Sequence, residues 1–295
     1  MSRKACSYTC VYCQVGPTTE KIIEPKTFFT PAQIHAAVAR HVHKLRQRGL
    51  PVDYLTFVPE GEPTLDSNLG ESIDRLRELG IPVAVISNST LLWRSEVRER
   101  LARADLVSVK VDAVHGDAWR RINLPHRDLS LDTILHGIQT FAADFDGTLI
   151  TDTMLIAGMN DDRASLEDTA AFLAGISPAT AYLAVPIRPT TVQQVHATDQ
   201  AGLVRAHEIF AAHLPSVELL TGHEPGEFAH TGDARDDLLA ITAVHPMREE
   251  DVRQLLGKDH AAWEVVETLL AEGTLEVVEY GGLPYYLRPM RCSRR

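Results

Sequence analysis

Three cysteines stand close together near the start of the chain: Cys6, Cys10 and Cys13, within the run CSYTCVYC. Their spacing, Cys-x3-Cys-x2-Cys, lets a single loop present three thiolates to one site. A cuboidal 4Fe-4S cluster has four irons and is normally held by four thiolates. Three thiolates leave one iron without a protein ligand, and an open iron can bind a reactant. The spacing therefore favours an iron–sulfur cluster that takes part in chemistry.

Two other uses of these cysteines have to be weighed. A structural zinc site takes four Cys or His ligands, but no His lies within the loop and the remaining cysteine, Cys292, is near the other end of the sequence. A disulfide with one spare thiol does not suit a chain that shows no secretory signal. Closely spaced cysteines in an intracellular protein usually bind metal. We therefore predict that Cys6, Cys10 and Cys13 are metal ligands.

The cysteine spacing, with the aromatic Tyr12 before the third cysteine, resembles the defining motif of the radical S-adenosylmethionine (radical SAM) superfamily. The resemblance implies an enzyme, an oxidoreductase, with a 4Fe-4S cluster and S-adenosyl-L-methionine as cofactors. In that family the open iron chelates the methionine moiety, and an electron from the cluster cleaves the sulfonium to release a 5′-deoxyadenosyl radical that abstracts hydrogen. The resemblance also implies a reducing partner such as flavodoxin or ferredoxin, and it places Tyr12 near the adenine.

Further segments resemble the branch related to wyosine-type tRNA base-synthesis enzymes. They are CSYTCVYCQVG, EGEPTL, KVDA, INLPH and VPIRP, spanning about Cys6 to Pro189. The sequence departs from this branch in two ways. Only five residues precede Cys6, so either the chain starts further upstream or the first strand is missing, and there is no second set of cysteines. The substrate stays open between a small molecule, a peptide and RNA.

The same resemblance assigns further cofactor contacts at the ends of predicted strands. The segment Gly61-Glu62-Pro63 is assigned to the methionine amino group, with Gly61 letting the backbone approach a ligand closely; the alternative is an ordinary βα turn. The polar side chains assigned to ribose hydroxyls and the methionine carboxylate are Ser87, Asn88 and Asp112. Arg188 is a candidate for binding an anionic group or an exposed structural arginine.

One predicted strand indicates where a substrate lies. Side chains alternate between the two faces of a strand, so Val107, Val109 and Val111 share the face toward the helices. Ser108, Lys110 and Asp112 share the other, which in a barrel is the lumen. A buried Lys and Asp need partners or ligands, so Lys110 is a catalytic candidate; the alternative is a structural ion pair with Asp112.

Alternating strands and helices must position these residues. Between residues 30 and 220 we predict strands at 54–58, 82–87, 106–111, 149–156, 181–187 and 217–220, and helices at 30–49, 67–79, 96–102, 130–143, 165–173 and 200–213. Repeated βα units imply parallel strands with right-handed crossovers and ligand loops at the carboxyl ends of the strands. The predicted fold class is α/β: a partial (β/α) barrel of radical SAM type over residues 1–223, with the first strand in doubt.

A second, smaller unit follows a polar stretch rich in Gly and Pro. We predict a linker at 224–232 and a winged-helix-like α+β domain at 233–295, with helices at 234–244, 248–256 and 260–271 and a hairpin turning at Gly281-Gly282. The third helix carries Glu264 and Glu267 and no Lys or Arg, so we expect not nucleic-acid binding but a docking module for a protein or peptide partner, or a lid on the barrel. A non-catalytic iron–sulfur redox sensor with a winged-helix output is the alternative function.

Composition agrees with these expectations. The chain has 295 residues, 44% hydrophobic and 23% charged, as in ordinary globular proteins. No apolar run approaches the length of a membrane-spanning helix, so we expect no membrane association and a cytoplasmic location. The net charge of −11 repels phosphate backbones and lowers the expectation of a tRNA substrate.

Overall fold

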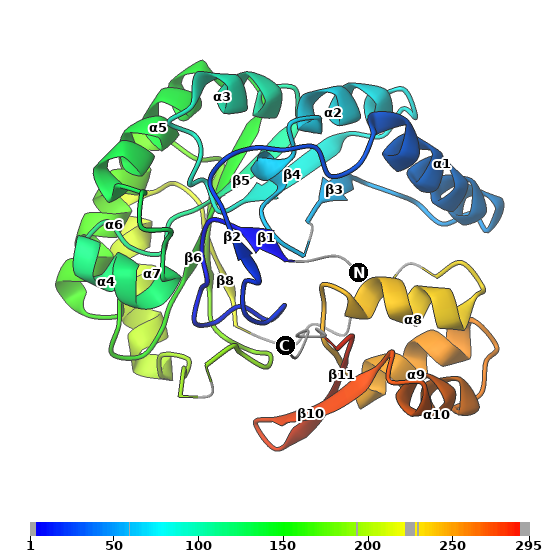
Figure 1. The fold of residues 1–295 in the computed structure, drawn as a ribbon. Coiled ribbons are helices and arrows are strands. Elements are labelled where there is room, and N and C mark those ends of the chain that lie inside the picture. The colour runs from blue at the N-terminus through cyan, green and yellow to red at the C-terminus, as the bar shows by residue number, and fades with distance from the viewer. Residues whose placement is uncertain (1–3, 59, 193, 222–227, 229, 290–295) are drawn as a thin grey trace.

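The structure is a computed structural model that describes residues 4–289, except 59, 193, 222–227 and 229. Its centre is a sheet of six parallel strands that lie side by side in chain order. The strands are β3 (Leu55–Phe57), β4 (Val83–Ser87), β5 (Leu106–Lys110), β6 (Thr148–Met154), β7 (Thr180–Ala184) and β8 (Val217–Leu220). The predicted α/β fold with a parallel sheet is confirmed, and the curved sheet is consistent with a partial barrel (Figure 1).

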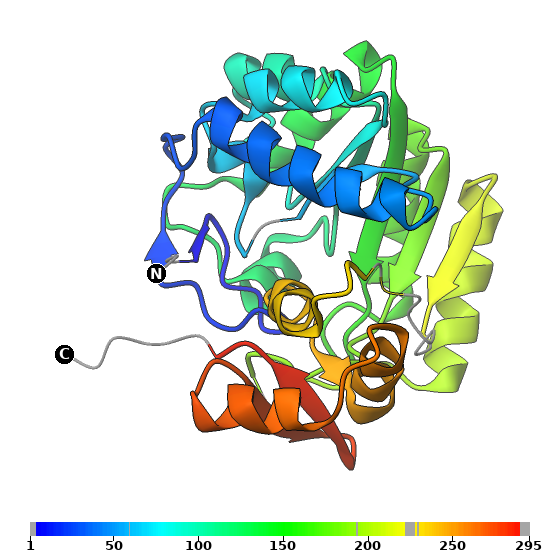
Figure 2. The same ribbon diagram turned by 90° about the vertical axis from the view of Figure 1, so that its right-hand side faces the viewer.

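Helices cover the outer side of this sheet (Figures 1 and 2). They are α1 (Pro31–Gln47), α2 (Leu69–Arg77), α3 (Ser95–Leu101), α5 (Leu131–Asp144), α6 (Arg163–Ile176) and α7 (Gln200–His213). Helix α1 begins as its sequence predicts, because Thr30 and Gln33 form a capping box and Pro31 takes the first helical position. Gly49, with φ of +69°, follows its end.

The two faces of the sheet differ as the alternation predicts. Val107 and Val109 are fully buried toward the helices, in one large hydrophobic core. On the opposite, concave face, the strand register aligns polar side chains across four neighbouring strands. That row is Lys110, Asp152, Tyr182 and Glu218, from β5, β6, β7 and β8 respectively. The sheet thus offers one apolar face to the helices and a charged row to the inside.

The first strand, β1 (Ala5–Cys6), pairs in parallel with β2 (Glu20–Lys21). These two strands form a separate small sheet beside the concave face of the main one (Figure 1). Two further elements of this part of the chain were not predicted. They are a 3₁₀ turn at Pro63–Leu65 and the helix α4 (Gly116–Asn123). The 3₁₀ turn directly follows Glu62 and α4 follows Asp112, two residues that the resemblance assigns to the cofactor.

A second hydrophobic cluster belongs to the C-terminal residues. The elements there are α8 (Ala234–Thr242), β9 (Met247–Arg248), α9 (Glu249–Lys258), α10 (Glu264–Ala271), β10 (Glu276–Tyr280) and β11 (Leu283–Leu287). The strands form an antiparallel sheet in the order β10–β11–β9, and we call this part the C-terminal module. Gly281 and Gly282 turn the hairpin with φ of +59° and +77°. Most of the predicted linker, and Cys292, lie outside the described residues.

Several predicted bounds are corrected by the structure. The third helix of the module was expected from residue 260, but it begins at Glu264, because His260 has φ of +54° and residues 260–263 are not helical. Strand β7 ends at Ala184, three residues before its expected end at 187, where a chain segment containing Pro186 and Pro189 leaves the sheet. Within the described residues, no helix has the length and apolar character needed to cross a membrane.

Candidate active site at the cysteine loop

The loop that carries the three cysteines is fixed to helix α4. The amides of Thr9 and Val11 donate to the carbonyls of Asn123 and Ile122, over 3.0 and 2.9 Å, so the carboxyl end of α4 lies against the loop. Within the loop, the amide of Cys13 donates to the carbonyl of Cys10 over 3.1 Å and forms a tight turn. Cys6, Cys10 and Cys13 are half-buried and carry free thiols. The loop therefore holds a fixed shape without a disulfide among these three.

Each of the three sulfurs accepts a hydrogen bond from a side-chain nitrogen. Asn88 Nδ2 donates to Cys6 Sγ and Asn123 Nδ2 donates to Cys10 Sγ, each over 3.4 Å, while Lys4 Nζ donates to Cys13 Sγ over 2.9 Å. Asn88 was predicted as a cofactor contact. Asn123 lies in the INLPH segment but had no predicted role, and Lys4 was not singled out. These donors come from three different parts of the chain.

Burial changes the acidity of two of these thiols. It raises the pKa of Cys6 to about 11, with the nearby Glu62 carboxylate adding to the effect. It raises the pKa of Cys10 to about 12, and Asp112 adds to that effect. Both groups are therefore protonated at neutral pH in the metal-free protein. Metal binding at thiols requires the deprotonated form, so binding here releases protons.

The donor set fits a 4Fe-4S cluster with three protein thiolates. Cys6, Cys10 and Cys13 lie within eight residues of one another, on a loop that its hydrogen bonds to α4 hold in place. Among the described residues, no group of three or more His, Cys, Asp or Glu side chains is spaced to hold a single metal ion. A cluster differs from a single ion, since each thiolate binds a separate iron. The N–H donor at each sulfur suits a thiolate, which carries negative charge.

Glu62 connects the loop after β3 with the end of β4. Its carboxylate is buried and accepts hydrogen bonds from the backbone amides of Thr64 (3.0 Å) and Asn88 (2.7 Å) and from the hydroxyls of Thr64 (2.6 Å) and Ser87 (2.7 Å). Burial raises the pKa of Glu62, while these bonds lower it. Ser87 and Glu62, both predicted cofactor contacts, are thus joined to each other. Pro63 is buried at the start of the 3₁₀ turn.

Gly61, predicted as a cofactor contact, allows a close approach within the chain itself. A Cβ atom at this position would lie 1.9 Å from the carbonyl oxygen of Ala5 in β1. The neighbouring amide of Glu62 donates to the same oxygen over 3.0 Å. Gly61 therefore fixes the strand that leads into Cys6.

Asp112 links four segments at the inner edge of the sheet. Its Oδ2 accepts hydrogen bonds from Tyr12 Oη (2.5 Å) and Asn123 Nδ2 (2.7 Å), and its Oδ1 accepts one from the amide of Met154 (3.0 Å). Lys110 Nζ lies 3.4 Å from Asp112 Oδ1 and 2.9 Å from Asp152 Oδ2. Both predicted elements of the lumen, the Lys and the Asp, therefore meet in an ion pair.

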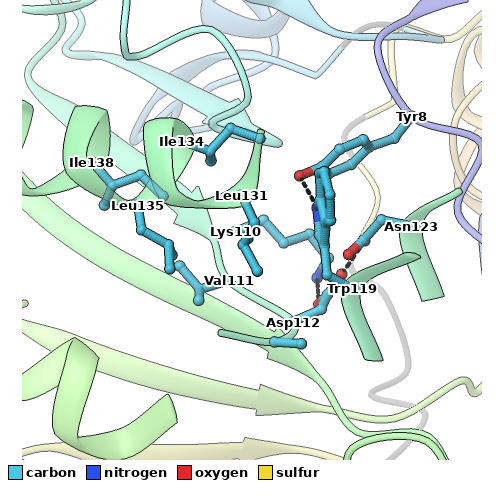
Figure 3. A pocket seen from close by; sticks show the side chains of 11 residues that line it. Tyr8, Lys110, Val111, Asp112, Trp119, Asn123, Leu131, Ile134, Leu135 and Ile138 are labelled. Carbon is cyan, nitrogen blue, oxygen red and sulfur yellow. Dashed lines mark hydrogen bonds and ion pairs between the residues drawn. The ribbon is translucent and has the colours of Figure 1, made fainter. Parts of the chain in front are cut away.

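The charges around Lys110 keep it protonated. Burial alone lowers the pKa of a lysine, but Asp112 and Asp152 outweigh it and raise the pKa of Lys110 above its usual range. Its ammonium also lies 5.2 Å from the centre of the Tyr12 ring. Tyr12 thus packs against the Lys110–Asp112 pair. Figure 3 shows Lys110, Asp112 and Asn123 around a small pocket of about 10 Å³, the size of one water molecule.

Arg188 lies where the C-terminal module meets the cysteine loop. Its guanidinium donates to Gln14 Oε1 over 3.2 Å, and Gln14 directly follows Cys13. Gln14 Nε2 in turn donates to the carbonyl of Val244 in the module over 3.0 Å. The Arg188 side chain forms no hydrogen bond to the described residues that bond to Glu62 or Asp112. The structure thus brings Arg188 to the edge of the site, next to the third cysteine.

Comparison with known proteins agrees with this site. The family model of the radical SAM superfamily matches residues 3–173. The UPF0026 protein MJ1312 of Methanocaldococcus jannaschii is 40% identical over 290 residues, covering 98% of this chain and 90% of its own length. A radical SAM methyltransferase from Sphaerobacter thermophilus superposes with a TM-score of 0.58 at 18% identity, over 75% of this chain and 64% of that protein. Streptococcus suis SuiB bound to S-adenosylmethionine gives 0.55 at 13% identity, over 75% and 48%.

Proposed function

This chain belongs to the radical SAM superfamily and is a radical SAM enzyme, and from this premise we propose its reaction. We propose that Cys6, Cys10 and Cys13 hold a 4Fe-4S cluster and that the enzyme reductively cleaves S-adenosylmethionine to abstract hydrogen from a substrate. One observation carries the proposal: one loop presents three sulfurs, and each accepts an N–H donor from the surrounding chain. The sensor alternative is not proposed, because the chain belongs to an enzyme superfamily.

When bound, the cluster and S-adenosylmethionine supply the electron and the radical chemistry. The protein's own residues position the loops around them. Glu62 holds the turn after β3 against Ser87 and Asn88 at the end of β4. Asp112 holds Tyr12 of the cysteine loop against Asn123 of α4. These contacts support the assignment of this edge of the sheet to the cofactor.

We place the substrate along the concave face of the sheet, next to the cysteine loop. The row of Lys110, Asp152, Tyr182 and Glu218 supplies charged and hydroxyl groups there. Ile86 of β4 also faces this side, and 44% of its surface is exposed. Because Lys110 is held protonated, it can donate a proton or stabilise negative charge, but it is not poised as a base. The substrate class, including any wyosine-type base, stays open.

For the C-terminal module we propose a winged-helix arrangement that receives a protein partner. The element order, helix–strand–helix–helix–strand–strand, supports that arrangement. Helix α10 begins with Glu264 and Glu267 in its first turn and has no basic residue in its last. Such a helix repels nucleic-acid phosphates. An electron donor such as flavodoxin or ferredoxin is a further partner that the proposed reaction requires.

Anaerobic reconstitution tests the proposed reaction. The purified chain is loaded with iron and sulfide, reduced with dithionite and mixed with S-adenosylmethionine, and 5′-deoxyadenosine is measured. We expect release of 5′-deoxyadenosine by the unmodified chain and its loss, with loss of the cluster absorbance, in Cys6→Ala, Cys10→Ala and Cys13→Ala. Cys292→Ala is the matched control and should keep both. A protein that binds no iron, or a Cys292→Ala variant that fails like the others, would show the ligand assignment to be wrong.

A further inference from the structure

The hydrogen bonds to the three cysteine sulfurs are not equivalent. Cys6 and Cys10 each accept a neutral side-chain amide N–H, from Asn88 and Asn123, at 3.4 Å. Cys13 accepts from the ammonium of Lys4, and this contact is shorter, at 2.9 Å. One of the three sulfurs therefore has a positive charge as its direct neighbour, and the other two have dipoles.

The chain fixes Lys4 firmly in this place. Its carbonyl accepts hydrogen bonds from the amides of Thr19 and Glu20, over 3.2 and 3.0 Å, where β1 and β2 begin to pair. Its side chain crosses to the turn after the third cysteine, where the ammonium also donates to the carbonyl of Gly16. Only 5% of the Lys4 surface is exposed. A position held at both ends in this way cannot easily turn toward water.

The charge of Lys4 has no acidic partner in the described part of the chain. Its ammonium contacts one sulfur and one carbonyl oxygen there, and no described carboxylate lies within ion-pair distance of it. A buried charge is costly unless an opposite charge lies beside it. The negative charge of a cluster held by thiolates would balance the ammonium. The position of Lys4 is thus explained if the cysteines carry such a cluster.

We propose that Lys4 is a positioning residue that raises the reduction potential of the cluster through its charged hydrogen bond to Cys13. The proposal rests on the function proposed above. Reduction transfers one electron from an external reductant to the cluster, with no bond made or broken in Lys4. The added negative charge is stabilised by a nearby cation, and hydrogen bonds to the sulfurs and local charge are known to set such potentials. Lys4 therefore favours the reduced state.

A redox titration monitored by electron paramagnetic resonance tests this inference. The reconstituted protein is poised with dithionite and mediators, without S-adenosylmethionine, and the signal of the reduced cluster is measured against potential. Lys4→Met removes both the charge and the N–H donors, Lys4→Gln keeps an N–H donor without the charge, and Lys4→Arg keeps both. Lys21→Met is the matched control, because Lys21 lies in the adjacent β2, is exposed and donates to the carbonyl of Leu124.

We expect Lys4→Met to lower the ratio of reduced to oxidised cluster at a fixed potential by about tenfold or more, which corresponds to about 59 mV for one electron. Lys4→Gln should fall between Lys4→Met and the unmodified protein, while Lys4→Arg and Lys21→Met should stay within about threefold of the unmodified protein, well short of that tenfold change. An unchanged ratio of reduced to oxidised cluster in Lys4→Met, or the same change of that ratio in Lys21→Met, would overturn this inference and leave the proposed function standing. If Lys4→Met binds no cluster, equal ratios in Lys4→Gln and Lys4→Arg would overturn it. No cluster in the unmodified protein would instead overturn the proposed function.

Discussion

Asp112 shows how one side chain can organise the site. Its carboxylate accepts hydrogen bonds from Tyr12 and Asn123, which lie in the cysteine loop and in α4, and it pairs with Lys110 of β5. The carboxylate needs these donors, because an unpaired buried charge is strongly unfavourable. The same carboxylate, together with Asp152, also keeps Lys110 protonated. Asp112 therefore links the position of the cysteine loop to the charge of the concave face.

The thiols themselves give a prediction that depends on pH. In the folded, metal-free protein burial raises the pKa of Cys6 to about 11 and that of Cys10 to about 12, whereas an unfolded cysteine has a pKa of about 8.5. Only the thiolate reacts with iodoacetamide. At pH 8 we expect both residues to be alkylated more slowly in the folded than in the urea-unfolded protein, on the order of a hundredfold for Cys6 and a thousandfold for Cys10.

The dependence on pH separates this effect from simple shielding. A raised pKa predicts that the rate for the folded protein increases about tenfold for each pH unit between 8 and 10, while the rate for the unfolded protein levels off near pH 9. Peptide mapping by mass spectrometry follows Cys6 and Cys10 individually. A constant ratio between folded and unfolded rates at all pH values would show that steric shielding, and not the pKa, slows the reaction.

At the scale of elements, the turn after β3 and the strand β1 depend on each other through Gly61. Replacing Gly61 with Ala places a methyl group 1.9 Å from the carbonyl oxygen of Ala5, so β1 has to move and the Glu62–Ala5 hydrogen bond is lost. We expect Gly61→Ala to lower the free energy of unfolding by about 3 kcal/mol. Urea denaturation of the metal-free protein measures this change.

Gly175 provides the matched control for that substitution. It lies within α6, and a Cβ atom there would have no atom within 4 Å. Because alanine restricts the unfolded chain more than glycine, Gly175→Ala should raise stability by about 0.5–1 kcal/mol. Equal effects of the two substitutions would mean that the close approach of Gly61 to β1 is not a feature of the folded protein. The displaced strand should also weaken iron binding in Gly61→Ala only.

The elements that could be predicted from sequence are those with strong local signals. The capping residue Thr30 followed by Pro31 marks the start of α1, and alternating valines mark β5. Helix α4 was missed, because it has eight residues and its first residue is Gly116, preceded by His115, which provides no side-chain cap. Local signals of this kind depend only on residues a few positions apart.

Most hydrogen bonds within the site, in contrast, join residues that are far apart in the sequence. The three cysteines were singled out by their spacing, and the Gly-Glu-Pro segment by its resemblance to the family. Asn123 reaches Cys10 across 113 positions and Asn88 reaches Cys6 across 82, and no local pattern encodes such pairs. Lys4 is near Cys13 in sequence, but its contact depends on how β1 and β2 pair. Sequence thus identified the sulfurs, and folding was needed to identify their hydrogen-bond donors.

At the scale of the whole molecule, the C-terminal module is joined to the cysteine loop and to the segment after β7. Gln14, next to Cys13, donates to the carbonyl of Val244. Tyr285 Oη donates to the carbonyl of Ile187 over 2.9 Å, and Tyr280 Oη donates to that of Pro186 over 3.2 Å. The module therefore contacts the two residues directly before Arg188 and the residue that follows Cys13. It thus lies beside the cysteine loop.

Tyr285 and Tyr286 provide a test of this docking, because they are adjacent and face opposite ways. Tyr285 is buried against the barrel and also accepts a hydrogen bond from Arg248 Nε over 3.0 Å. Tyr286 packs into the module's own core with its ring edge-on to Trp263, 5.7 Å between ring centres, and its hydroxyl has no hydrogen bond to another described residue. Removing the Tyr285 hydroxyl therefore weakens docking of the module on the barrel, while removing the Tyr286 hydroxyl does not.

We expect Tyr285→Phe to weaken the docked state by about 1 kcal/mol, since the hydrogen bond from this hydroxyl to the carbonyl of Ile187 in the barrel is lost. Hydrogen–deuterium exchange should then be about fivefold or more faster at the amides of Ile187 and Arg188, because a penalty of this size raises the population of the undocked state in proportion. Tyr286→Phe should leave these amides unchanged. If both variants exchange like the unmodified protein, the Tyr285 hydroxyl does not hold the module in place. If both exchange faster, the module is loosened from within and not at its contact with the barrel.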